Sequence, residues 1–70
     1  MKRQALEFVV DTAMRSLVEE RVRQSAGDGL DRLTIAPVDG TARYRITALV
    51  ARAIAPAVMC AVMNALDEKG

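Results

Sequence analysis

The sequence predicts a single small α+β domain in which two helices flank a β-hairpin. Three observations lead to this fold class: apolar residues recur at helical spacing towards both ends, apolar and polar residues alternate around Asp39-Gly40, and glycines separate the first pattern from the second. The chain has 70 residues, which is enough for one domain. We therefore treat residues 1–70 as one unit with the element order α-β-β-α.

The first predicted helix covers about residues 2–25. Its apolar stripe contains Leu6, Val10, Ala13 and Leu17 at helical spacing. The opposite ridge, read in steps of four, is charged and consists of Arg3, Glu7, Asp11, Arg15, Glu19 and Arg23. Opposite charges at this spacing stabilise a helix, so this ridge is expected to face water. The glycines that follow are typical of a helix end.

The predicted hairpin covers about residues 31–47. If Asp39 and Gly40 are the central residues of a type I′ turn, Val38 faces Thr41 and Ile35 faces Tyr44. One face of the ribbon then collects Leu33, Ile35, Tyr44 and Ile46, and the other collects Arg32, Thr34, Arg43, Arg45 and Thr47. Pro37 lacks an amide donor, which places the first strand of this hairpin at an edge of the sheet, or ends it there.

The second predicted helix covers about residues 48–66, with Thr47 as its N-cap. Read in steps of four, it has a large row (Val50, Ile54, Val58, Val62 and Leu66) beside a small row (Ala53, Ala57, Ala61 and Ala65). Such a surface lets another helix approach closely. Met59, Cys60 and Met63 make the remaining side apolar, so we expect Cys60 to be buried. Pro56 either kinks this helix or begins a second helical piece.

The apolar content predicts self-association. The chain is 51% hydrophobic, and one amphipathic helix cannot cover both a hairpin face and a helix that is apolar nearly all round. We therefore expect a homodimer or higher homo-oligomer, joined either through sheet edges or through the last helix. The alternative is a compact monomer in which the hairpin folds over both helices. The residues expected to pack in the core or the dimer are Leu33, Ile35, Tyr44, Ile46, Val50, Ile54, Ala57, Val58, Ala61 and Val62.

The composition argues against an enzyme and against a bound cofactor or metal. The sequence has no histidine and one cysteine, and it contains no glycine-rich phosphate loop. The candidate interaction residues are Arg32, Arg43, Arg45, Arg15, Glu19 and Arg23. We predict a small homodimeric module that binds a protein partner as its regulator, inhibitor or adaptor. The lone cysteine favours a cytoplasmic location.

Two alternative functions follow from particular segments. The arginine-bearing hairpin has the dimensions of a ribbon that enters a DNA major groove, although a net charge of +1 gives little attraction to a polyanion. Residues 46–66 are long enough to span a membrane, but Arg52, Pro56 and Asn64 interrupt them. The sequence therefore ranks protein binding first, nucleic-acid binding second and membrane association third.

Overall fold

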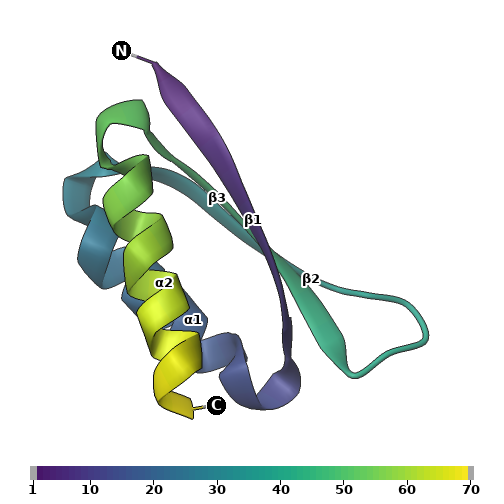
Figure 1. The fold of residues 1–70 in the computed structure, drawn as a ribbon. Helices are drawn as coiled ribbons and strands as arrows, with labels where there is room; N and C mark the ends of the chain where they lie inside the picture. Colours follow the sequence, from purple (N-terminus) through teal and green to yellow (C-terminus); the bar gives the residue numbers. More distant parts are fainter. Residues whose placement is uncertain (1, 70) are drawn as a thin grey trace.

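A computed structural model describes residues 2–69 of the chain, with Lys69 described in its backbone only. The elements in order are β1 (Arg3–Asp11), α1 (Thr12–Ala26), a 3-10 turn η1 (Gly27–Gly29), β2 (Leu30–Pro37), β3 (Arg43–Ala51), a 3-10 turn η2 (Arg52–Ile54) and α2 (Ala55–Lys69). The strands form one antiparallel sheet in the order β1-β3-β2, and both helices cover the same side of it (Figure 1). The predicted α+β class with two helices and a hairpin is confirmed.

The predicted start of the first helix is wrong, because residues 3–11 form β1 and the helix begins at Thr12. The charged positions Arg3, Glu7 and Asp11 are spaced by four, and a step of four keeps side chains on one side of a strand as well as of a helix. The alternation of buried Leu6, Phe8 and Val10 with exposed residues shows the period of a strand. Asp11 then caps α1, since its Oδ1 accepts a hydrogen bond from the Met14 amide at 3.1 Å.

The hairpin exists, but its register differs from the predicted one by two residues. Ile35 lies opposite Ile46 and Pro37 opposite Tyr44, and residues 38–42 form the connection. Only Gly40 has a positive φ in this turn, at 76°, which excludes the type I′ turn and fits type II. A shift of two residues leaves every side chain on its predicted face, because the strand period is two.

The predicted boundary between hairpin and last helix is also wrong. Thr47 does not cap a helix but lies within β3, which continues to Ala51, and α2 begins at Ala55. Buried Ile46, Ala48 and Val50 carry the alternating pattern through this region. Pro56 is in the first turn of α2, where a missing amide hydrogen costs no helical hydrogen bond.

The core lies between the inner face of the sheet and the two helices. Its largest fully buried side chains are Ile46, Val18, Val22, Val50, Val58 and Val62. Cys60, which was expected to be buried, is exposed because it lies on the side of α2 opposite the core. The β2–β3 connection projects beyond the helical layer (Figure 1), so the sheet is longer than its cover.

Candidate interaction surfaces

Within residues 2–69, no strand pairs with the outward edge of β1. The Arg52 amide donates to the Lys2 carbonyl at 3.0 Å, and the Thr12 amide donates to the Ala42 carbonyl at 3.1 Å. Both bonds belong to the same register as the β1–β3 pairing, so even-numbered residues of β1 direct their amides and carbonyls at β3. The odd-numbered residues direct theirs away from the sheet. These are Arg3, Ala5, Glu7, Val9 and Asp11.

Exposed hydrophobic side chains gather beside this edge. Among the described residues, the large hydrophobic side chains that are exposed are Val9 (49%), Met59 (37%) and Met63 (59%). Val9 belongs to β1, and the two methionines belong to the flank of α2 that faces away from α1. We call the free backbone edge of β1, together with Val9, Met59, Met63 and Leu66, the β1 edge surface.

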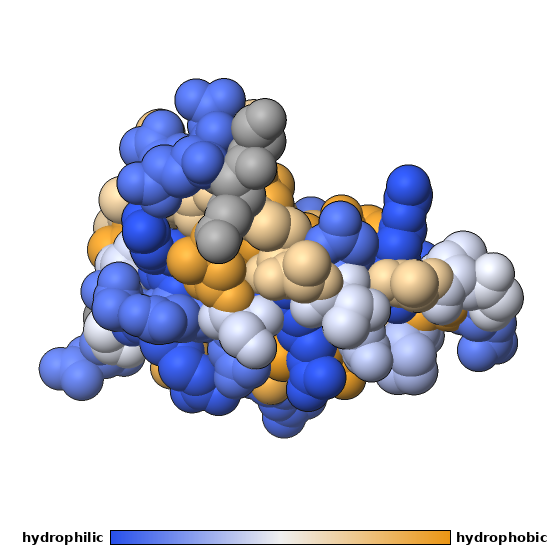
Figure 2. Space-filling view, turned by 90° about the horizontal axis from the view of Figure 1, so that it is seen from below, coloured by the Kyte–Doolittle hydropathy of each residue, from blue (hydrophilic) through white to orange (hydrophobic). Residues whose placement is uncertain are grey.

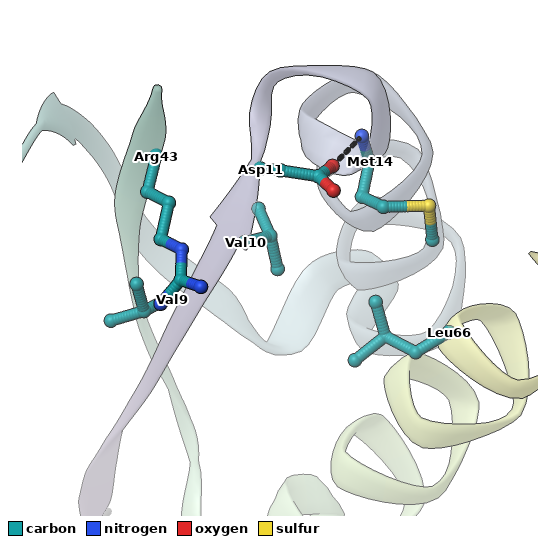
Figure 3. Close-up of a pocket in the computed structure, with 6 residues that line it drawn as sticks. All are labelled: Val9, Val10, Asp11, Met14, Arg43 and Leu66. Atoms are coloured by element: carbon teal, nitrogen blue, oxygen red, sulfur yellow. Dashed lines mark hydrogen bonds between the residues drawn. The ribbon is translucent and has the colours of Figure 1, made fainter. Parts of the chain in front are cut away.

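Two hollows lie along this surface, one at each end of β1. The first is lined by Gln4, Leu6, Ala55, Pro56 and Met59. The second is lined by Val9, Val10, Asp11, Met14, Arg43 and Leu66. In Figure 3, Arg43 and Val9 lie on one side of β1, whereas Met14 and Leu66 approach from the helices on the other. The second hollow therefore reaches around the strand edge.

The edge of β2 is different. The Val38 amide donates to the Arg43 carbonyl at 3.0 Å, so Leu33, Ile35 and Pro37 are the residues whose backbone faces outward. Pro37 has no amide to offer there, and the position of β2 at the sheet edge confirms the prediction made from this proline. At the other end of β2, the pairing register shifts between Leu30 and Arg32. Such irregularities protect strand edges from further pairing.

The outer face of the sheet carries the three predicted hairpin arginines. Arg32, Arg43 and Arg45 are all exposed there, together with Arg3 of β1. The Arg45 Nε atom lies 3.6 Å from Glu7 Oε1, and the Arg3 Nε atom lies 3.4 Å from Asp31 Oδ1. Acidic side chains thus interleave with the basic ones. Seen from below, hydrophilic and hydrophobic residues also alternate over the surface (Figure 2).

The predicted ridge on the first helix survives only in part. Arg23 pairs with Glu19 at 3.6 Å, and the Arg15 guanidinium lies 4.8 Å from the centre of the Tyr44 ring. Arg15 thereby joins the start of α1 to the beginning of β3, next to the hairpin connection, through a cation–π contact. The ridge is a solvated helical surface whose charges already have partners.

The residues predicted to pack differ in burial. Ile46, Val50, Val58 and Val62 are buried, whereas Ala57 is exposed. The half-buried members are Leu33, Ile35, Tyr44, Ile54 and Ala61. Sequence reasoning missed the β1 edge surface, because residues 3–11 were assigned to a helix. The alternation of Leu6, Phe8 and Val10 was the signal that could have revealed it.

The described residues contain no group of three or more histidine, cysteine, aspartate or glutamate side chains placed to hold a metal ion. Nor does this part of the chain contain a helix long and apolar enough to cross a membrane. Residues 46–51, the start of the span considered from the sequence, belong to β3.

Comparison of the chain with protein-family models, curated proteins and solved structures gives no match.

Proposed function

We propose that the chain is a small, non-enzymatic, homodimeric protein-binding module that acts as a regulator, inhibitor or adaptor of a partner protein. The observation that supports this function is the β1 edge surface, where free backbone groups lie beside exposed Val9, Met59 and Met63. Exposed strand edges with adjacent apolar pockets are a common way to bind protein segments. The outward face of α2, with exposed Ala57 and Cys60, supports the proposed self-association.

Affinity capture with matched baits tests the protein-binding function. Ala5→Pro removes an outward amide of β1 without removing a hydrogen bond to β3, so the fold is retained while the edge is blocked. We expect this bait to recover about tenfold less of a stoichiometric partner from the native host, since one lost backbone hydrogen bond costs about 1–3 kcal/mol. Arg32→Ala with Arg45→Ala, on the outer face, should recover as much partner as the wild-type bait.

The opposite pattern of capture would refute the assignment of partner binding to the β1 edge. If the Ala5→Pro bait captures the partner normally and the arginine variant does not, the outer sheet face is the binding surface. The variants Arg15→Ala and Arg23→Ala, combined, remove the same charge from α1 and serve as the control for a general effect of charge.

Nucleic-acid binding is the second candidate, favoured by the position of Arg32 and Arg45 with Thr34 and Thr47 on one face of a projecting ribbon. The ion pairs of Arg45 and Arg3 weigh against it. If duplex DNA is a ligand, its affinity falls with salt, and Arg32→Ala with Arg45→Ala flattens the logarithmic slope by about two. Absence of binding at low salt removes this candidate.

A further inference from the structure

We propose that β1 binds an extended segment of another protein, which adds an antiparallel strand to the sheet and places alternate apolar side chains in the two hollows. This inference rests on the proposed protein-binding function and specifies its ligand. It follows from the direction of the free backbone groups, the position of the hollows and the charges on the outer side of β1.

The backbone of β1 supplies the hydrogen bonds. The five odd-numbered residues, from Arg3 to Asp11, present both an amide and a carbonyl to an incoming strand along a regular stretch of 9 residues. An antiparallel partner matches such residues as hydrogen-bonded pairs, and it continues the pattern of the existing sheet. The edge contains no proline, and its pairing with β3 has no register shift.

The hollows determine the side chains on the helical side of the added strand. Residues of that strand opposite Gln4 and Leu6 enter the hollow beneath Met59, and those opposite Val10 enter the hollow beside Leu66. Both hollows have apolar side chains in their walls. The ligand segment therefore carries apolar residues at every second position.

The charges on the other side of β1 determine the remaining positions. Arg3, Glu7 and Asp11 are exposed and spaced by four residues. Arg3 and Glu7 lie on the outer face, where they contact Asp31 and Arg45, and Asp11 lies at the end of β1, where its carboxylate caps α1. An antiparallel strand is complementary when a basic residue lies opposite Asp11, a second basic residue lies opposite Glu7 and an acidic residue lies opposite Arg3. The segment is thus basic near its start and acidic at its end.

A second copy of this chain fits the site less well. Antiparallel pairing of β1 with β1 of another copy requires a two-fold axis perpendicular to the sheet, so both α2 helices lie on the same side. The α2 helix of each copy then approaches the space beside Met59 and Met63 of the other copy. An extended segment without a helix leaves this space open. The same pairing, centred on residue 7, places Arg3 opposite Asp11 of the other copy, which is favourable, but it places Glu7 opposite Glu7 at its centre.

A synthetic peptide tests this ligand class. Its nine residues are, in order, lysine, valine, threonine, valine, lysine, valine, threonine, valine and glutamate. The valine amides would face away from β1, and N-methyl groups on them prevent the peptide from pairing with itself. The matched control carries N-methyl groups on the two threonines and the central lysine, whose amides would face β1. We expect the first peptide to shift the amide resonances of Ala5, Glu7 and Val9, and the control to bind at least about tenfold more weakly.

A charge exchange tests the register. The Glu7→Lys variant is expected to bind the first peptide several-fold more weakly. A peptide with glutamate in place of the central lysine is expected to restore the affinity for this variant. A spin label at the peptide N-terminus should broaden the resonances of Val9 and Asp11 and leave Arg3 and Ala5 sharp. Broadening at Arg3 would contradict the antiparallel direction.

Three results would overturn the inference. Equal affinity of both methylated peptides would show that the outward carbonyls of β1 do not accept hydrogen bonds from the peptide. Sedimentation of the free chain as a dimer whose Ala5, Glu7 and Val9 amides are already protected would show that a second copy occupies the edge. Capture of a partner that Ala5→Pro leaves unchanged, with neither peptide binding, would preserve the protein-binding function and reject the strand-addition ligand alone.

Discussion

The two edges of the sheet differ in the features that hinder pairing with a further strand. Both β1 and β2 pair with β3, and both direct alternate backbone groups outward. The β2 edge has Pro37 at one end and a register shift near Asp31 at the other, which are the usual devices against unwanted pairing. The β1 edge has neither device, and exposed hydrophobic side chains flank it. This difference supports the proposal that the β1 edge binds an added strand.

The largest effect on stability is expected from a substitution in β3, the strand that pairs with both β1 and β2. Ile46 of β3 is fully buried, and Ile46→Ala removes core contacts below β1 and β2 together. We expect the free energy of unfolding to fall by about 2–5 kcal/mol. Leu49→Ala, on the outer face of the same strand, is the control and should cost less. Chemical denaturation of both variants measures the difference, and equal losses would show that the core is not where we place it.

Proline substitutions at two neighbouring residues separate the role of β1 in the fold from its proposed role in ligand binding. Gln4 and Ala5 are both exposed, but the Gln4 amide faces β3 and the Ala5 amide faces outward. We expect Gln4→Pro to destabilise the fold by about 1–3 kcal/mol, since it leaves a carbonyl of β3 unpaired. Ala5→Pro should have a smaller effect on unfolding and a larger one on ligand binding. If both variants unfold alike, the assignment of the free edge is wrong.

The sequence predicted the central elements better than the first segment, for a physical reason. In the hairpin, turn residues and alternation independently indicated the same faces, and an error of two residues in register left those faces unchanged. In residues 3–11, the spacing of four between Arg3, Glu7 and Asp11 fitted both a helix and a strand. The hollows beside β1 could not be predicted, because they depend on where Met59 and Leu66 of α2 pack relative to β1.

The cap at the end of β1 is expected to contribute less than the strand pairing. Asp11→Ala removes the carboxylate that accepts a hydrogen bond from the Met14 amide. Loss of such a cap typically lowers the free energy of unfolding by about 1 kcal/mol. Asp28→Ala changes the same residue type at an exposed position and should cost less than about 0.5 kcal/mol. Thermal unfolding of the two variants compares them. A larger loss for Asp28→Ala would contradict the capping role of Asp11.

The smallest effect on stability is expected from removing the block on β2. Pro37→Thr restores an outward amide at this edge without disturbing a bond to β3. We expect unfolding to change by less than about 1 kcal/mol, while the chain gains concentration-dependent association. Light scattering over a range of concentrations measures this gain. A variant that scatters like the wild type would show that Pro37 does not protect the edge.

Amide hydrogen exchange of the intact chain, with and without the valine-methylated peptide, shows whether a strand is added at β1 and at no other edge. We predict that the peptide slows exchange at Ala5, Glu7 and Val9 and leaves Leu33 and Ile35 of β2 as fast as before. Unchanged exchange along β1, or equal slowing at both edges, would contradict the account.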